Sequence, residues 1–392
     1  MNILLLNLTK MVGDTGGVAK VACAFANEMY RRGHKVSLVY SDVKTGDFFF
    51  PIDKSIACTD LRHFNGEAIR YPLALKIKRE LYRIFDKQKA FTVNAVFETY
   101  LLKKLQIVLN QIHPDIIVSF NSAGSKLLLC DLQTKIPVIT MSHGDISDVF
   151  ERYPKAEITA LEKSAVCQVL VPSYERILKE HLPKAHVVVI GNVVPQYDIQ
   201  ADLSPQKETY KILFVGRLAK SHKRPHLLIE AFAKLASDFP NWCVELWGAE
   251  HGKVYYKELE SLIKKHHLEN KVFLKGTTNN VKDVLVKGDL LAFPSAYEGF
   301  SLALTEAMSM GLPAVGYKNC SGLNELIRNG VSGFLCDDGV DDFADKLKTL
   351  MENQELRVQM GQAARESMKQ YSARKIWDTW EMLLRKVLED DD

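Results

Sequence analysis

LLAFPSAYEGFSLALTE, residues 290–306, joins an apolar strand to a helix through a turn centred on Gly299. The run 290–293 has no polar residue, which is typical of a strand covered on both faces of a parallel sheet. Glu298 and Glu306 have seven residues between them, and the helix that begins there presents backbone N–H groups at its amino end, where phosphates bind. Ionised carboxylates accept hydrogen bonds from sugar and ribose hydroxyls. The stretch therefore predicts a pocket for a phosphorylated sugar.

Apolar runs of similar length recur on both sides of this stretch and alternate with helical patterns. Such runs indicate strands with helices on both faces, as in a doubly wound parallel sheet. The first series is 3–8, 36–40, 116–120, 138–141, 169–171 and 187–190, and the second is 212–215, 244–247, 272–274, 290–293, 313–315 and 333–335. The pattern predicts an α/β fold of two Rossmann-like, doubly wound parallel-sheet domains.

The length of 392 residues also indicates two domains, since one core usually serves roughly 100 to 200 residues. A polar segment, 196–209, separates the two series of strands and is predicted to link them. We expect an N-terminal domain over 1–198 and a C-terminal domain over 199–372. The remaining residues, 373–392, carry a helix whose apolar positions repeat at helical spacing.

Composition restricts the class of function. The chain is 47% hydrophobic and 25% charged, and its net charge of +3 lacks the basic excess of a nucleic-acid-binding protein. Seven cysteines occur without a CxxC pair, which favours reduced cytoplasmic thiols over disulfides or a zinc site. No basic region precedes the short apolar run at the amino end, so no signal peptide is predicted. We expect a cytoplasmic protein that acts on small molecules, with no nucleic acid and no metal.

Two cations follow the strand predicted at 212–215. Arg217 comes directly after Gly216, and Lys223 precedes the next helix. Cations at the carboxyl end of a strand can neutralise a diphosphate, each charge-assisted hydrogen bond contributing on the order of 1.5 to 3 kcal/mol. Solvated loop cations are the alternative interpretation, and the nearby Glu298 stretch favours the diphosphate.

A glycine pair, Gly16–Gly17, lies in the loop after the first strand. Paired glycines let the backbone approach a ligand, and the helix that follows favours anions. The loop lacks a GxGxxG pattern, which argues against a dinucleotide-dependent dehydrogenase. A purely structural tight turn is the alternative.

These motifs together resemble a known family. Glu298-x7-Glu306, preceded by Gly216-Arg217 and Lys223 and followed by Gly311-Leu312-Pro313, is similar to the signature of retaining glycosyltransferase family four, enzymes of GT-B fold. The resemblance implies two domains facing across a cleft, with the terminal helix packed back on the first. It implies metal-independent transfer of a hexose or N-acetylhexosamine from a nucleotide diphosphate sugar to a saccharide or lipid-linked acceptor, in polysaccharide or glycoconjugate synthesis and without a cofactor.

The resemblance also implies roles for individual residues. The diphosphate would be bound by Arg217 and Lys223, sugar hydroxyls by Glu298 and the ribose by Glu306. The residues expected at the catalytic site are His143, Arg217, Lys223 and Glu298. Those expected to bind the donor are Gly16, Gly17, Asn192, Gly276, Thr277, Phe300, Ser301, Leu302 and Glu306, and those expected on the acceptor side are Asp14 and Asp145. A structural histidine and a helix-start acid are the alternatives for His143 and Asp145.

Other functions are compatible with the same motifs. A non-catalytic GT-B subunit would bind a sugar nucleotide without transferring the sugar. An epimerase or phosphorylase of GT-B fold is a further alternative, and the nucleotide base, uridine or guanosine, stays open.

The segment 68–89 combines apolar residues at helical spacing with seven lysines and arginines. A basic amphipathic helix is compatible with contact to an anionic membrane, which would make the protein peripheral to the inner face of the cytoplasmic membrane. An ordinary core-facing helix with a solvated basic side is the alternative.

Overall fold

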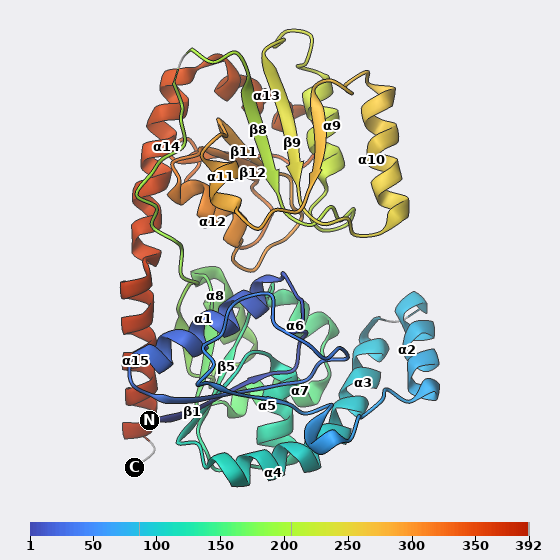
Figure 1. Cartoon of the computed structure of the whole chain (residues 1–392), viewed down its shortest axis with the longest axis vertical. Helices are drawn as coiled ribbons and strands as arrows, with labels where there is room; N and C mark the ends of the chain where they lie inside the picture. The colour runs from blue at the N-terminus through green and yellow to red at the C-terminus, as the bar shows by residue number, and fades with distance from the viewer. Residues whose placement is uncertain (86, 205, 391–392) are drawn as a thin grey trace. The chain divides into compact units, whose positions relative to one another are not determined.

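The computed structural model describes residues 1–85, 87–204 and 206–390. The chain divides into two compact units, each built around one parallel sheet (Figure 1). Unit 1 comprises Met1–Asn192 and Ile376–Asp392, and unit 2 comprises Val193–Lys375.

Unit 1 contains a seven-stranded sheet in the order β3-β2-β1-β4-β5-β6-β7, and every neighbouring pair is parallel. The central strand β1 pairs in register with both neighbours, Leu5 lying opposite Leu38 and Val118. The order of strands reverses between β1 and β4. The strands are β1 (Asn2–Asn7), β2 (Lys35–Tyr40), β3 (Ala57–Asp60), β4 (Ile116–Ser119), β5 (Val138–Met141), β6 (Val166–Val169) and β7 (Val187–Val189).

Helices cover this sheet because its central strands are apolar on both faces, which leaves neither face suited to water. The helices of unit 1 are α1 (Gly17–Arg31), α2 (Leu73–Phe85), α3 (Lys87–Glu98), α4 (Leu102–Ile112), α5 (Ser122–Lys126), α6 (Ser147–Arg152), α7 (Lys155–Lys163) and α8 (Pro172–His181), with most of α15 (Ala373–Glu389).

Unit 2 contains a six-stranded parallel sheet in the order β10-β9-β8-β11-β12-β13, with the reversal between β8 and β11. Its strands are β8 (Tyr210–Val215), β9 (Trp242–Trp247), β10 (Val272–Gly276), β11 (Leu290–Phe293), β12 (Ala314–Tyr317) and β13 (Gly333–Cys336). Its helices are α9 (Pro225–Ala233), α10 (Lys253–Lys265), α11 (Val281–Leu285), α12 (Leu302–Ser309), α13 (Asp341–Glu352) and α14 (Gln354–Met368).

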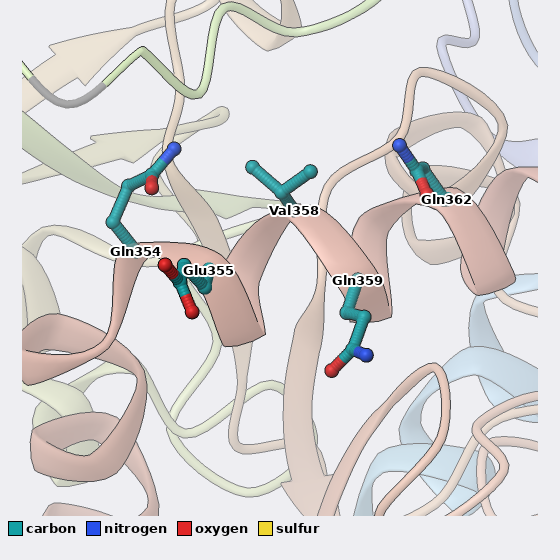
Figure 2. A pocket seen from close by; sticks show the side chains of 5 residues that line it. All are labelled: Gln354, Glu355, Val358, Gln359 and Gln362. Atoms are coloured by element: carbon teal, nitrogen blue, oxygen red, sulfur yellow. The ribbon is translucent and has the colours of Figure 1, made fainter.

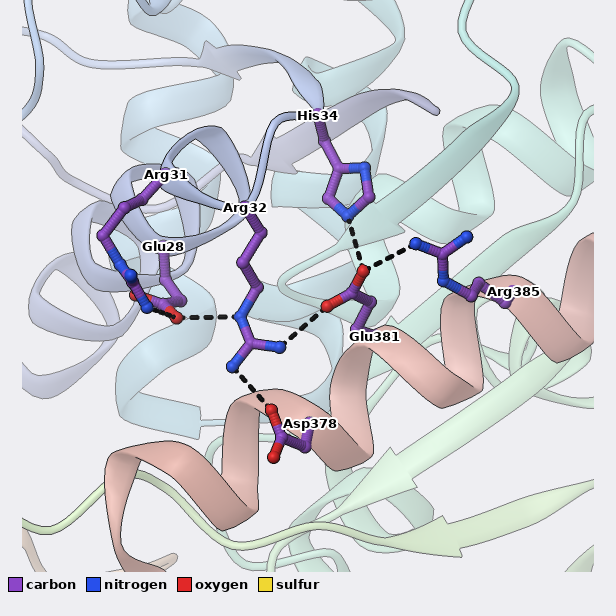
Figure 3. A network of polar contacts seen from close by, with 7 residues as sticks. All are labelled: Glu28, Arg31, Arg32, His34, Asp378, Glu381 and Arg385. Carbon is purple, nitrogen blue, oxygen red and sulfur yellow. Dashed lines mark hydrogen bonds and ion pairs between the residues drawn. The ribbon is translucent and has the colours of Figure 1, made fainter.

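The terminal helix α15 packs on α1 of unit 1. Trp377 and Trp380 contact the ring of Phe25 edge-on, with centroids 5.5 and 5.0 Å away. Beside this apolar contact, the Arg32 guanidinium donates to Asp378 and Glu381 of α15 at 2.8 and 2.7 Å (Figure 3). Aromatic packing and a polar network therefore hold the last helix on the first unit.

Two strands depart most from the prediction, and the others agree with their predicted ranges to within two residues at each end. β3 was not predicted, because its residues, ACTD, form a partly exposed edge strand without an apolar run. β6 was predicted at 169–171 but occupies Val166–Val169, since Gln168 interrupts the apolar pattern. That glutamine is buried, and its side-chain amide donates to the Ile190 carbonyl.

The polar segment 196–209 packs on unit 2, where its described residues form neither helix nor strand. The Ala201 amide donates to the Met310 carbonyl at 2.7 Å, and the Arg365 guanidinium donates to the Tyr197 carbonyl, also at 2.7 Å. The described residues of the segment are therefore attached to unit 2.

Candidate functional site

The reversal of strand order in unit 2 places two loops side by side at the carboxyl edge of its sheet. β8 leads into Gly216-Arg217, and the adjacent β11 leads into the turn 294–299. Loops that diverge at such a switch point are where doubly wound sheets bind ligands. Hydrogen bonds join them directly, since the Ala296 amide donates to the His222 carbonyl at 2.8 Å.

Lys223 and Glu298 meet where these two loops come together. The Lys223 Nζ lies 2.5 Å from Glu298 Oε1, and the two side chains are only 12% and 7% exposed. The same ammonium lies 4.8 Å from the centre of the Phe293 ring at the end of β11, a cation–π contact. The structure thus brings together two residues that were predicted separately and fixes them as an ion pair shielded from water.

His222 also faces Glu298, a neighbour that the sequence analysis did not include. Its Nε2 lies 3.6 Å from Glu298 Oε1 and 2.8 Å from the Tyr297 carbonyl, and its ring stacks on that of Tyr297. Burial lowers the pKa of His222, although the Glu298 carboxylate acts in the opposite direction. The cation of this cluster is therefore lysine, with histidine beside it as a neutral ring near pH 7.

Arg224 holds the backbone of the turn 294–299. Its guanidinium donates to the carbonyls of Pro294 and Ser295 at 2.9 and 3.3 Å, pairs with Asp338 at 3.1 Å and stacks over Tyr317. These contacts assign the side chain to holding the backbone of the turn. Arg217, by contrast, is exposed, and its charge helps to lower the pKa of His222.

A glycine shapes the backbone beneath Glu298. A Cβ built on Gly322 would lie 2.4 Å from the carbonyl oxygens of both Glu298 and Gly299, and Gly322 has a φ of +72°. The neighbouring Ser321 carbonyl accepts from the Glu298 amide at 3.1 Å. A side chain at position 322 would therefore displace the turn that carries Glu298.

The helix α12 begins directly after this turn. Ser301 is its N-cap and accepts from the Leu304 amide at 3.4 Å, while Phe300 is buried edge-on against Tyr371. The predicted phosphate-binding amides of residues 300–302 thus lie at the helix amino end, where the helix dipole favours anions.

Glu306 lies further along α12 and is also buried. Burial and the Glu306 carboxylate together raise the pKa of Tyr197 to about 12, so the carboxylate has this phenol as a neighbour. The two glutamates of the motif therefore occupy different surroundings, one beside a lysine and one beside a tyrosine.

The next strands end at the same edge of the sheet. The Gly248 amide after β9 donates to the carbonyl of Gly276, the last residue of β10, at 2.8 Å. A Cβ on Gly248 would lie 1.9 Å from the Gly216 carbonyl oxygen, so only glycine permits this approach. Thr277 follows β10 and is exposed.

In unit 1, the predicted residues also follow strand ends, and Gly16 and Gly17 follow β1 at the reversal of strand order. Gly16 is the N-cap of α1 after β1, and Gly17 is the first residue of the helix. A Cβ on Gly16 would lie 2.7 Å from Asp14 Oδ2, so the Asp14 carboxylate folds back over the glycine. Asn192 is buried after β7 and is the last residue of this part of unit 1.

His143 follows β5 and stacks on the buried Phe120, which follows β4, with ring centroids 5.5 Å apart. The Nε2 atom is shielded from solvent and has no hydrogen-bond partner among the described residues. Burial lowers the pKa of the ring to about 4. Asp145, two residues later, accepts from the Ser147 amide at 3.0 Å. A neutral imidazole with an unused polar atom thus lies at this strand end.

A pocket of about 300 Å³ lies elsewhere in unit 2, along α14. It is lined by Gln354, Glu355, Val358, Gln359 and Gln362 (Figure 2). The lining contains no cation for a diphosphate and none of the predicted site residues, so the strand-end cluster is the better candidate.

The described residues contain no group of three or more histidine, cysteine, aspartate or glutamate side chains placed to hold a metal ion. They also contain no helix with the length and apolarity needed to cross a membrane.

Residues 195–367 match the family described as Glycosyl transferases group 1. Over nearly its whole length, the chain is similar to a protein of Haemophilus influenzae named as an uncharacterized glycosyltransferase, which is 25% identical over 380 residues, covering 95% of this chain and 97% of that one.

A second relative is from Campylobacter jejuni, with 23% identity over 95% of this chain and 96% of its own. It is named as a GalNAc-alpha-(1->4)-GalNAc-alpha-(1->3)-diNAcBac-PP-undecaprenol alpha-1,4-N-acetyl-D-galactosaminyltransferase. Among solved structures, a mutant of S. aureus TarM in complex with fondaparinux, alpha-GlcNAc-glycerol and UDP superposes with a TM-score of 0.73, covering 98% of this chain and 99% of that one at 17% identity.

The two doubly wound parallel sheets therefore form a GT-B fold, and this fold-class prediction is confirmed. Residues 195–367, which match the group 1 glycosyl transferases, make up most of unit 2.

Proposed function

We propose that the protein is a retaining glycosyltransferase that moves a hexose or N-acetylhexosamine from a nucleotide diphosphate sugar to a saccharide or lipid-linked acceptor, in polysaccharide or glycoconjugate synthesis. The observation that carries the proposal is the shielded Lys223–Glu298 pair next to the amino end of α12. At this switch point, the cation and the helix dipole suit the phosphates of such a donor, and the carboxylate suits its hydroxyls.

Lys223 and Arg217 stabilise the negative charge that develops on the leaving diphosphate, aided by the amides of residues 300–302. Charge of this kind is stabilised best by groups already fixed in place, because no reorganisation is then needed during the reaction. The short ion pair and the Phe293 ring fix the Lys223 ammonium in this way.

Glu298 accepts hydrogen bonds from hydroxyls of the transferred sugar, and Glu306 accepts them from the ribose. Lys223 orients the Glu298 carboxylate through Oε1. An ionised carboxylate accepts several hydrogen bonds, so sugar hydroxyls can donate to it as well. Neither glutamate is assigned as a nucleophile. The departing phosphate takes the acceptor proton, as the family resemblance implies.

His143 serves as a hydrogen-bonding group for the sugar or the acceptor rather than as a charged acid. With a pKa of about 4, its ring is neutral at pH 7, and its unpartnered Nε2 needs a polar partner. Gly16, Gly17 and Asn192 are assigned to the donor, and Asp14 and Asp145 to the acceptor, as the resemblance implies.

The related proteins support the substrate class. The Campylobacter relative is named for transfer of an N-acetylhexosamine to a saccharide on a diphospho-lipid, and the TarM crystal contains UDP. We therefore assign a uridine nucleotide sugar as the donor.

The proposal is tested by incubating the purified protein with uridine and guanosine diphosphate sugars and candidate saccharide acceptors. We expect acceptor-dependent release of the nucleoside diphosphate and a product with the anomeric configuration of the donor, read by NMR. Lys223→Met should lower turnover by on the order of 100-fold, because it removes a fixed cation from the leaving group.

Lys220→Met is the matched control. Lys220 lies in the same loop but is 62% exposed and paired with Glu258, so its removal should leave turnover within about twofold of wild type. Donor binding without any transfer would favour a non-catalytic subunit. Dependence on inorganic phosphate would favour a phosphorylase, and interconversion of the sugar would favour an epimerase. Equal activity of the two lysine variants would contradict the site assignment.

A further inference from the structure

The helix α2 presents its apolar side to solvent. None of its 13 residues, all of them described, is buried. Five large apolar side chains are exposed over more than half of their surface, namely Leu73 (71%), Ile77 (54%), Leu81 (53%), Ile84 (76%) and Phe85 (81%). At about 100° per residue, they fall within an arc of about 120° on one side of the helix. A core-facing helix would show the opposite arrangement.

The orientation of α2 is fixed by contacts on its other side. Arg79 lies over the ring of Tyr71, which stacks on Phe97, and Arg62 also lies over the ring of Phe97. The helix also packs along α3, and in Figure 1 it forms the outer edge of unit 1 beyond that helix. Rotating the apolar side inward would break this four-membered stack, so its exposure is built into the fold.

Basic residues border the apolar side. α2 carries four basic residues and one acidic residue, and the acidic Glu80 is already paired with Arg79 and Arg83. Lys76 and Lys78 are exposed. A bilayer with acidic lipids has anionic headgroups at its surface and hydrocarbon beneath them. The exposed apolar stripe is complementary to the hydrocarbon, and the flanking lysines are complementary to the headgroups.

We propose that α2 docks the protein on anionic lipid bilayers, lying in the plane of the interface with Leu73, Ile77, Leu81, Ile84 and Phe85 inserted among the lipids. The flanking cations bind lipid phosphates. Contact through α2 is peripheral, since the helix is 13 residues long and mostly polar on its other face. This binding is independent of the proposed transferase reaction, because it uses no residue assigned to the donor or the acceptor.

The test is vesicle flotation of the full chain without any sugar nucleotide, so failure would leave the transferase proposal standing. The vesicles are phosphatidylcholine alone, or an equal mixture with phosphatidylglycerol. We expect wild-type protein to float with the anionic vesicles, less so in high salt and least with phosphatidylcholine alone.

Substituting serine at Ile77, Leu81, Ile84 and Phe85 together should lower binding to anionic vesicles by at least about tenfold, because the inserted area is lost. The matched control is Val254→Ser with Met382→Ser, two apolar residues that are 76% and 63% exposed on other helices. A third variant, Lys76→Gln with Lys78→Gln, should bind partially and with less dependence on salt.

Melting temperatures check that the variants fold, and light scattering measures their mass. The proposal is overturned if wild-type protein does not bind anionic vesicles, or if the serine variant binds as well as the control. It is also overturned if the wild type is a dimer that the serine variant converts to a monomer, because a second copy would then cover the stripe.

Discussion

At the scale of single residues, one oxygen of Glu298 is shared by two basic neighbours. Lys223 lies at 2.5 Å and His222 at 3.6 Å from Oε1. Burial lowers the pKa of the histidine, so lysine provides the lasting charge. The spacing of the two motif glutamates indicated a carboxylate for sugar hydroxyls, but it contained no information on these neighbours. Lys223 is 75 residues away in sequence, and only the pairing of β8 with β11 brings it near.

His143 predicts a measurable pH dependence of stability. Its pKa is lowered from 6.5 to about 4 by burial, so the unfolded chain binds a proton in this range and the folded protein does not. Stability should therefore be full above pH 6.5 and fall as the pH decreases toward 4, by about 2 kcal/mol between pH 7 and pH 5. Urea unfolding of wild type and His143→Gln at both pH values measures the difference, and the loss of stability between pH 7 and pH 5 should be about 2 kcal/mol smaller in the variant.

His251→Gln is the control for this experiment. His251 is an exposed residue, so its removal should leave the pH dependence of wild type unchanged. An identical loss of stability between pH 7 and pH 5 in wild type and in His143→Gln would contradict the assignment.

At the scale of elements, α15 is held on α1 by two kinds of contact, an apolar stripe and a network of ion pairs. Trp377 and Trp380 supply buried area against Phe25, whereas Arg32 pairs with Glu28 of α1 and with Asp378 and Glu381 of α15 (Figure 3). Hydrogen bonds from Arg32 and Arg385 lower the pKa of Glu381 to about 2. The helix was predicted from its periodicity, but the arginine network was not.

We expect Trp380→Ala to cost about 3–5 kcal/mol of unfolding free energy and Arg32→Met only about 1–2 kcal/mol. The difference arises because Trp380 is fully packed, whereas Asp378, one partner of Arg32, is 47% exposed. Denaturant unfolding at pH 7 measures both. The effect of Arg32→Met should shrink as the pH falls from about 4.5 toward 2, because Glu381 contributes only while it is ionised.

Met382→Ala provides the reference for this helix, because Met382 is 63% exposed and should change stability by less than about 0.5 kcal/mol. Equal costs for Trp380→Ala and Met382→Ala would show that α15 is not held by the aromatic contact.

At the scale of the whole molecule, each unit has its own sheet and its own reversal of strand order. The proposed groups for the diphosphate and ribose all belong to unit 2. A ligand that binds there should stabilise the folded form of that unit by mass action.

We predict that a sugar nucleotide at 100 times its dissociation constant stabilises unit 2 by about 2.7 kcal/mol, which corresponds to about 5–10 °C in melting temperature for a unit of this size. Scanning calorimetry with and without uridine and guanosine diphosphate sugars measures the shift. Lys223→Met should reduce it and Lys220→Met should not. A shift that is the same in both variants would place the nucleotide elsewhere.

Much of the architecture follows from local sequence. Apolar runs such as 290–293 identified strands covered on both faces, because a strand buried on two sides can carry no polar residue without a partner. The apolar-run pattern misplaced β6 and missed β3, for opposite reasons. Gln168 is buried but has its partner in a distant carbonyl, and β3 is an edge strand that needs no apolar run.

The sequence by itself determined the two doubly wound sheets, the basic amphipathic character of 73–85 and the glutamate motif, because periodicity and spacing are local properties. Only the tertiary structure decided that Lys223 pairs with Glu298, that Arg224 braces the turn, and that α2 turns its apolar side outward. Each of these depends on contacts between segments far apart in the chain, and a helix pattern does not reveal which side faces the core. The physical reason is the same throughout: local sequence sets what an element can bury, and packing decides what it does bury.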